Sequence, residues 1–250
     1  MQDSIEYHQN LPPDVRQTAG VFAEEYRVEG ARSFFVCDRA VFSESAVEPN
    51  AHFHEVLIGP CWMYFDVDVA PLSAATAIDL DNVFLGQLAA SLQHLLGAAN
   101  DMRYTYISDA SHDKKYSRHI VVKRLLNGVW TAYHTNSAMK YVAEDVHARL
   151  QAVTALSAID LGVYRRHQCF RALFSSKFGQ RRPLLPLWHT AAKEQLLQSL
   201  ITNVPLDVQL LSSDSKLCCD KDDLPMLEDG GRSPRPRHVE KEVGRKHATL

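Results

Sequence analysis

The stretch MYFDVDVAP, residues 63–71, places two carboxylates at the end of an apolar run. Aromatic and β-branched residues surround Asp66 and Asp68, so the run predicts a core strand that ends at Pro71. Side chains two positions apart share one face of a strand, so the two aspartates point the same way. Their mutual repulsion predicts a bound divalent cation, and hard oxygen ligands favour Mg²⁺ or Mn²⁺. The alternative is an ordinary strand-end pair that faces solvent or forms salt bridges.

The composition is that of an ordinary globular chain of 250 residues, 46% hydrophobic and 23% charged. A formal net charge of −3 does not indicate a nucleic-acid binder, although a local basic surface is compatible with it. The five cysteines are odd in number and irregularly spaced, which favours a reducing, intracellular compartment over a disulfide framework. No apolar run reaches the ~20 residues of a membrane helix, and residues 1–14 lack the apolar segment of a signal peptide.

Hydrophobic periodicity predicts an α+β fold, with antiparallel or mixed sheets flanked by helices. Predicted strands cover residues 33–36, 55–58, 61–69, 102–108, 118–122, 158–164 and 169–174. Predicted helices cover residues 79–97, 138–156 and 190–201, with Asp79 or Asp81 and then Thr190 as N-caps. The polar turn DASHDKK, residues 109–115, joins two of the strands as a hairpin and argues against a doubly wound sheet. Residues 158–164 and 169–174 are expected to form a strand pair.

The second informative stretch is KKYSRHIVVK, residues 114–123. By strand alternation, Lys115, Ser117 and His119 share one face, while Arg118 and Ile120 face the other way. An ammonium, a hydroxyl and an imidazole on one face suit phosphate oxygens. The alternative is a hydrated edge strand with an incidental histidine.

The third stretch is AIDLGVYRRHQCFRALFSSKFGQRRPL, residues 158–184. Asp160 stands between Ile159 and Leu161, so we expect it on a strand, where a buried carboxylate needs a partner such as a metal ion. The basic residues that follow are Arg165, Arg166, Arg171, Lys177, Arg181 and Arg182, with Phe170 and Phe174 among them. Basic residues interleaved with aromatics suit nucleotides and nucleic-acid backbones. The alternative is a solvated basic hairpin.

Together, the three stretches predict a site for two-metal nucleotidyl transfer. In this interpretation the three aspartates hold two cations that act on a primer 3′-hydroxyl and on a triphosphate. The residues expected to bind the phosphates are Lys115, Ser117, His119, Arg171 and Lys177.

These stretches resemble the PrimPol family of eukaryotic primase-polymerases, within the archaeo-eukaryotic primase superfamily. The superfamily motifs are an acidic pair on a strand, S-x-H, and a hydrophobic residue followed by Asp; here they read YFDVD, SRH and AID. The likeness covers about residues 20–185 and is most specific over 159–184. GARSFFVCDRAVF, residues 30–42, is also similar to a family strand that carries a nucleotide-contacting arginine, which is Arg32 here.

The resemblance implies an archaeo-eukaryotic primase catalytic core, a DNA-directed primase and polymerase that extends a primer in fork repriming and translesion synthesis. It implies Asp66, Asp68 and Asp160 as catalytic ligands of Mn²⁺ or Mg²⁺. The implied nucleotide-binding residues are Arg32, Lys115, Ser117, Arg118, His119, Gln168, Cys169, Arg171 and Lys177. The implied partners are a DNA primer-template, nucleoside triphosphates and single-stranded-DNA-binding proteins, with no membrane, in the nucleus or the mitochondrion.

Three departures from the family pattern matter. The acidic pair is Asp-x-Asp where PrimPol has Asp-x-Glu, and Gln168-Cys169 stands where the family has Arg-Asn. Adjacent Cys218 and Cys219 do not give the spacing of the family's zinc module. We therefore expect an N-terminal segment at 1–19, a catalytic core at 20–211 and a disordered tail at 212–250, with primer extension favoured over de novo priming.

Two other functions remain open at the level of sequence. One is a catalytically impaired or truncated DNA-binding paralogue, for which the changed acidic pair and the missing zinc module argue. The other is a glycosyltransferase that uses its Asp-x-Asp pair to hold Mn²⁺ and a sugar nucleotide. The second reading leaves the SRH stretch and the basic hairpin unexplained.

Overall fold

The computed structural model of the chain describes residues 1–47, 51–70, 73–97 and 100–212. The chain divides into two units, residues 1–219 and 220–250, and every described helix and strand belongs to the first. The expected tail at 212–250, with Cys218 and Cys219, lies outside the described residues apart from Ser212. No helix in the described part is long and apolar enough to cross a membrane.

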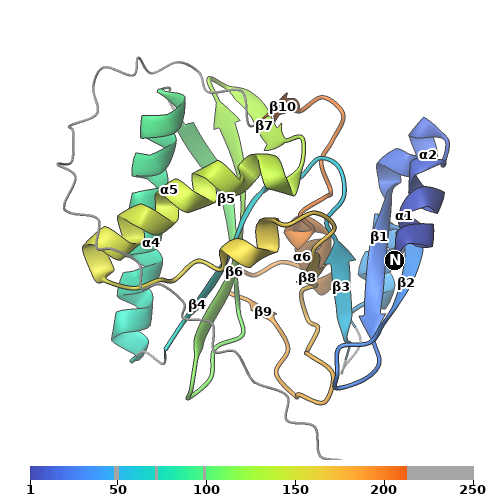
Figure 1. Cartoon of the computed structure of the whole chain (residues 1–250), viewed down its shortest axis with the longest axis horizontal. Helices are drawn as coiled ribbons and strands as arrows, with labels where there is room; N and C mark the ends of the chain where they lie inside the picture. Colours follow the sequence, from blue (N-terminus) through green and yellow to red (C-terminus); the bar gives the residue numbers. More distant parts are fainter. Residues whose placement is uncertain (48–50, 71–72, 98–99, 213–250) are drawn as a thin grey trace, which may run out of the picture. The chain divides into compact units, whose positions relative to one another are not determined.

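Helices and strands alternate irregularly along the described part of the chain (Figure 1). The helices are α1 (Gln2–Gln9), α2 (Pro13–Thr18), α3 (Arg39–Ser45), α4 (Ala74–Leu96), α5 (Asn136–Thr154), the 3₁₀ helix η1 (Leu161–Tyr164) and α6 (Ala192–Ser199). The strands are β1 (Ala19–Glu25), β2 (Arg32–Asp38), β3 (Phe53–Val56), β4 (Met63–Val69), β5 (Asn100–Asp109), β6 (Tyr116–Leu126), β7 (Val129–Tyr133), β8 (Cys169–Arg171), β9 (Leu185–Pro186) and β10 (Gln209–Leu211).

The described strands form two sheets. The smaller is antiparallel with the order β2-β1-β3-β8. The larger has the order β10-β7-β6-β5-β9, and β4 also pairs with β6. Only the β10–β7 pair is parallel among these strands, so the sheets are antiparallel and mixed, as the hairpin at 109–115 predicts.

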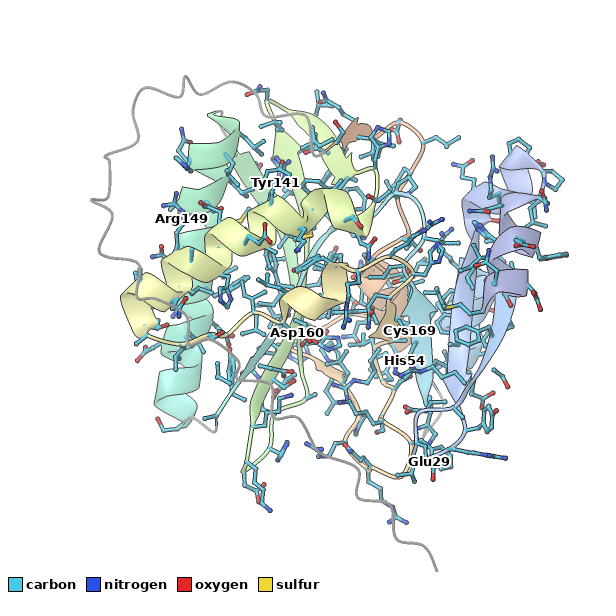
Figure 2. All side chains as sticks on the ribbon, in the orientation of Figure 1. Glu29, His54, Tyr141, Arg149, Asp160 and Cys169 are labelled. Carbon is cyan, nitrogen blue, oxygen red and sulfur yellow. The ribbon has the colours of Figure 1, made fainter. Side chains whose placement is uncertain are left out.

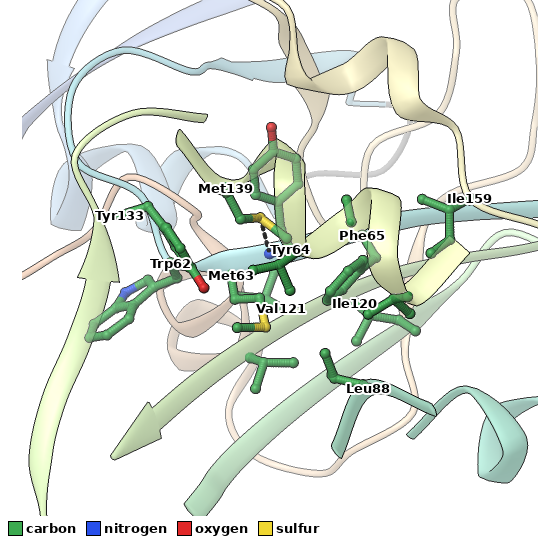
Figure 3. Close-up of a cluster of buried hydrophobic side chains, with 14 of the residues drawn as sticks. Trp62, Met63, Tyr64, Phe65, Leu88, Ile120, Val121, Tyr133, Met139 and Ile159 are labelled. Atoms are coloured by element: carbon green, nitrogen blue, oxygen red, sulfur yellow. Dashed lines mark hydrogen bonds between the residues drawn. The ribbon is translucent and has the colours of Figure 1, made fainter. Parts of the chain in front are cut away.

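The main hydrophobic core lies between the larger sheet and the helices α4 and α5 (Figures 1 and 3). The ring of Phe65 meets the ring of Phe84 on α4 edge to face, with centroids 5.0 Å apart. Met139 on α5 reaches β4 from another side, where its Sδ accepts a hydrogen bond of 3.4 Å from the backbone N–H of Tyr64. Because alternate residues of β4 face opposite ways, burying Phe65 against α4 turns Tyr64 and Asp66 to the other face.

Most of the predicted elements are present. The strand at 61–69 corresponds to β4, and the hairpin of 102–108 with 118–122 is the antiparallel pair of β5 and β6. The helix expected at 138–156 is α5, whose first turn is capped by Thr135 Oγ1 accepting from the Ala138 N–H at 3.1 Å. The helix expected at 190–201 is α6, but its N-cap is Ala191 rather than Thr190.

The prediction of a strand at 158–164 is wrong. Ile159 makes a single bridge to Val67, and the chain then enters η1. The carboxylate of Asp160 accepts a hydrogen bond of 2.7 Å from the Gly162 N–H and so caps the 3₁₀ turn. The expected partner strand, 169–174, is shortened to β8, and it pairs with β3 instead.

The N-cap expected for the helix at 79–97 is also wrong. The helix α4 begins at Ala74, so Asp79 and Asp81 lie within it. Asp81 instead accepts hydrogen bonds from the Tyr116 hydroxyl and from Arg118 Nε. The Asp81 carboxylate therefore links α4 to β6 by hydrogen bonds, and it does not cap the helix.

Candidate functional site

The pairing of β4 with β6 brings the first two motifs together. Asp66 lies directly opposite His119, and Asp68 lies directly opposite Ser117. Residues opposite one another in an antiparallel pair project to the same face. The acidic pair and the S-x-H motif therefore form one patch on the face of the larger sheet that α4 does not cover. Strand alternation alone predicts two separate patches, and only the register shows that they coincide.

The third motif lies along the other side of β4. The Asp68 N–H donates to the Ala158 carbonyl at 2.8 Å, and the Asp160 N–H donates to the Asp66 carbonyl at 2.9 Å. These backbone bonds place Asp160 beside Asp66 without a strand. The side chain of Asp160 is exposed, contrary to the expectation of a buried carboxylate. Figure 2 labels Asp160 near the middle of the view, at the start of η1.

Burial and mutual repulsion set the charge of the acidic patch. Burial, followed by the charges of Asp68 and Asp160, raises the pKa of Asp66 to about 7. The Oδ1 atoms of Asp66 and Asp68 are buried and have no hydrogen-bond partner among the described residues. The other oxygen of Asp68 accepts a 2.6 Å bond from Lys115 Nζ. Buried carboxylate oxygens with no donor are costly unless a ligand satisfies them.

The acidic patch fits a hard cation only in part. Oxygen atoms without donors on two adjacent carboxylates suit Mg²⁺ or Mn²⁺. Within the described ranges, however, no three His, Cys, Asp or Glu side chains are grouped closely enough to hold a metal ion. Asp160 is the group that fails to converge, because its carboxylate is turned to the Gly162 amide. Asp66 and Asp68 form the fixed part of the candidate metal site.

Basic side chains from the smaller sheet face the acidic patch. Arg171 lies opposite His54 in the pairing of β8 with β3. Burial lowers the pKa of Arg171, while the charges of Asp66 and Asp68 oppose that shift. The Nε atoms of Arg171 and Arg32 are buried without a hydrogen-bond partner among the described residues. Such guanidinium groups are suited to an anionic ligand.

His119 is held as a neutral group at the junction of the two patches. Its ring packs on the ring of Phe170, with centroids 4.2 Å apart. Burial lowers the pKa of His119 well below its usual range, and the charge of Arg171 acts in the same direction. Its Nδ1 atom is also buried without a partner among the described residues. His119 can therefore donate a hydrogen bond without carrying a charge.

His54 is a site residue that the sequence reasoning does not single out. It is 5% exposed on β3, and burial, followed by the charges of Arg32, Arg171 and Lys177, lowers its pKa to about 3. Its Nε2 lies 4.0 Å from Oε2 of Glu25 on β1. Figure 2 shows His54 close to Cys169 on the neighbouring strand. The pairing of β3 with β8 places His54 opposite Arg171, and this long-range contact has no signal in the segment HFHE, residues 52–55.

Four of the expected nucleotide-binding residues have no contact with the acidic patch among the hydrogen bonds and ion pairs of the described residues. Arg118 lies on the opposite face, where it bonds Asp109 and Ser111 Oγ. Lys177 is exposed, and the backbone carbonyl of Gln168 accepts a hydrogen bond of 2.9 Å from the Leu57 N–H. Burial raises the pKa of the Cys169 thiol, while the nearby Arg32 opposes that shift.

The acidic patch is accessible from one side. A groove of about 470 Å³ opens beside Asp68, between the turn that carries Lys114 and Lys115 and the segment 155–157 that follows α5. A ligand can therefore approach the carboxylates along the edge of β4.

No protein-family model matches this chain, and no curated protein is significantly similar to it. The geometry of the site and the motifs in the sequence are therefore the grounds for assigning a function.

Proposed function

We propose that this chain is the catalytic core of a DNA-directed primase-polymerase, which adds nucleotides to a primer 3′-hydroxyl by two-metal nucleotidyl transfer. One observation carries the proposal: Asp66 and Asp68 lie opposite His119 and Ser117, with Asp160 joined to Asp66 by a backbone hydrogen bond. Three motifs from distant parts of the sequence thus meet at one place on the sheet.

Each half of the site has a role in this proposal. Asp66, Asp68 and Asp160 would hold Mn²⁺ or Mg²⁺, with Asp160 turning away from Gly162 to join the other two. When bound, the ions lower the pKa of the attacking hydroxyl and neutralise charge on the departing pyrophosphate. Lys115 leaves Asp68 and binds a phosphate oxygen, since its 2.6 Å ion pair is partly exposed and easily exchanged.

The donors bind the triphosphate and keep it aligned. Ser117 and the neutral His119 donate to phosphate oxygens from β6. Arg171 and Arg32 offer guanidinium groups whose Nε atoms have no other partner among the described residues. Lys177 is exposed and reaches the outer phosphate from the loop after β8. The packing of Phe170 against His119 excludes water from the inner side of the site.

The direct test is primer extension on a primed DNA template, with Mg²⁺ and Mn²⁺ in parallel. Asp66→Asn and Asp160→Asn keep side-chain size and remove charge, so each should lower incorporation by about a hundredfold or more, or about 3 kcal/mol of transition-state stabilisation. Asp145→Asn is the matched control, because Asp145 forms a partly buried ion pair with Arg149 on α5, away from the three motifs. Equal activity in wild type and Asp66→Asn contradicts the proposal.

A second candidate is a DNA-binding module without catalysis. Two observations favour it: Asp68 is paired with Lys115, and Asp160 does not converge on the other carboxylates. Such a protein would bind a primer-template but incorporate nothing with either metal ion. The extension assay combined with a DNA-binding measurement separates the two candidates.

A further inference from the structure

A group of aromatic rings lies on the same sheet face as the candidate site. We call it the aromatic platform; it consists of Trp62, Tyr104, Tyr106 and Trp130, with Lys123 among them. In the pairing of β5 with β6, Tyr104 lies opposite Lys123 and Tyr106 lies opposite Val121. Ser117, His119 and Lys123 are separated by even numbers of residues on β6, so they share a face. The platform begins at Tyr106, opposite Val121 and two residues beyond His119, about 7 Å at ~3.3 Å per residue.

The ring of Tyr104 is nearly parallel to two other rings of the platform. Tyr104 and Trp130 have centroids 5.9 Å apart and planes inclined by 10°, and Tyr104 and Tyr106 are 6.3 Å apart with planes inclined by 16°. Trp62 meets Trp130 edge to face at 6.3 Å. Tyr104 is 48% exposed, although it belongs to a sheet. A parallel set of rings with an exposed member is a surface on which other flat groups can stack.

A positive charge is placed among the rings. Lys123 Nζ lies 5.4 Å from the ring centroid of Trp62 and 5.3 Å from that of Tyr106. Burial lowers the pKa of Lys123 to about 8, and the charge of Glu55 opposes that shift. The platform therefore combines stacking surfaces with one amino group placed among the rings. This combination suits a flat, anionic polymer better than an apolar protein partner.

We propose that the aromatic platform binds single-stranded nucleic acid, with bases stacked on Tyr104 and Trp130 and a phosphate near Lys123. That this strand is the template leading to the acidic patch rests on the proposed function, whereas the stacking itself does not. Duplex DNA hides its base faces, so the platform selects the single-stranded form. Because only one ammonium takes part, the contribution of the platform depends weakly on salt, with a slope of about −0.7 in log affinity against log salt.

The test measures binding of a fluorescent oligothymidylate by anisotropy, without metal ions or nucleotides. Tyr104→Leu and Trp130→Leu should each weaken binding about fivefold or more, the usual cost of losing a base-stacking ring. Tyr104→Phe keeps the ring and should bind like wild type. Tyr7→Leu is the matched control, because Tyr7 is an exposed tyrosine on α1, 63% accessible.

An abasic oligonucleotide of the same length separates stacking from charge. It keeps the phosphates and lacks the bases, so wild type and Tyr104→Leu should bind it equally. The proposal is overturned if Tyr104→Leu binds oligothymidylate like wild type, if it loses the same factor on the abasic strand, or if a proline oligopeptide binds the platform more tightly than the oligothymidylate. Circular dichroism confirms that each variant is folded.

The binding test and the primer-extension test can give different outcomes, so one proposal can be contradicted without the other. Asp66→Asn should lower incorporation by about a hundredfold or more and leave oligothymidylate binding unchanged, because the carboxylate is not part of the platform. Tyr104→Leu should weaken oligothymidylate binding whether or not the chain is a polymerase. Loss of affinity in both variants would overturn the assignment of binding to the platform.

Discussion

Nε2 of His119 lies 3.7 Å from Oδ1 of Asp66, and the two residues face each other across the paired strands β6 and β4. Burial lowers the pKa of His119 well below its usual range and raises that of Asp66 to about 7. Burial thus disfavours the charged form of each, and the contact does not act as an ion pair. At 3.7 Å the two side chains do not form a hydrogen bond with each other, although both are largely buried. A ligand bound between them would supply the missing hydrogen-bond partners.

Replacing His119 tests this explanation. His119→Ala should lower kcat/KM for the incoming nucleotide by about tenfold or more, the cost of a lost hydrogen bond to a charged group. His119→Asn keeps a donor and should recover part of the loss. Steady-state incorporation at varied nucleotide concentration gives both numbers. An unchanged kcat/KM in His119→Ala removes His119 from the nucleotide site.

Lys115 should affect metal and nucleotide binding in opposite directions. Its Nζ forms a 2.6 Å pair with Asp68, so in the absence of nucleotide it competes with a cation for that carboxylate. Lys115→Met should therefore bind Mn²⁺ a few times more tightly, since a partly exposed ion pair is worth about 1 kcal/mol or less. The same variant should bind the nucleotide more weakly, because a phosphate donor is lost. Calorimetric titrations with each ligand check the two effects, and changes of the same sign contradict this role.

His54 should make stability depend on pH in the acid range. Its pKa is lowered from 6.5 to about 3 in the folded protein, mainly by burial. Between these values the unfolded chain binds the extra proton, so the free energy of unfolding decreases as pH falls from about 6.5 towards 3, by on the order of 1 kcal/mol per pH unit. His54→Gln removes this titration. Urea unfolding at several pH values should show a shallower slope in the variant, and parallel slopes contradict the prediction.

Glu55 is a buried carboxylate with a structural role. It is 2% exposed and accepts hydrogen bonds from the Ile201 N–H at 2.8 Å and from the N–H and hydroxyl of Thr202 at 2.9 and 2.5 Å. Glu55→Ala leaves these donors without an acceptor and should lower the free energy of unfolding by about 3 kcal/mol. Glu44→Ala, at an exposed carboxylate on α3, should cost less than about 1 kcal/mol. Comparable losses in the two variants would show that the Glu55 bonds contribute little.

The sequence alone predicts which side chains of the site share a face within each strand. The period of two along MYFDVDV places Asp66 and Asp68 on one face, and the same alternation groups Ser117 with His119; β4 and β6 agree with both. Strand pairing is a long-range property, so the opposition of Asp66 to His119 has no signal in either segment alone.

The misplaced elements have physical explanations. AIDL, residues 158–161, alternates like a strand, but Asp160 caps a turn at Gly162, where a Cβ would lie only 2.9 Å from the Asp160 carboxylate. The strand β1 is absent from the sequence prediction. It is buried at nearly every position, so its sequence lacks the alternation of apolar and polar residues that marks a half-buried strand. β7 is absent from the sequence prediction, although Asn127-Gly128, with φ of 51° and 81°, is a recognised hairpin signal.

The central claim is that Asp66, Asp68 and Asp160 are placed together to hold metal ions. Mn²⁺ binding, followed by electron paramagnetic resonance in the presence of nucleotide, tests it most directly, with Asp145→Asn as the control carboxylate. We expect wild type and Asp145→Asn to bind Mn²⁺ equally, and Asp66→Asn to bind it about tenfold more weakly or worse, because a ligand is lost. Equal Mn²⁺ affinity in wild type and Asp66→Asn would contradict the account.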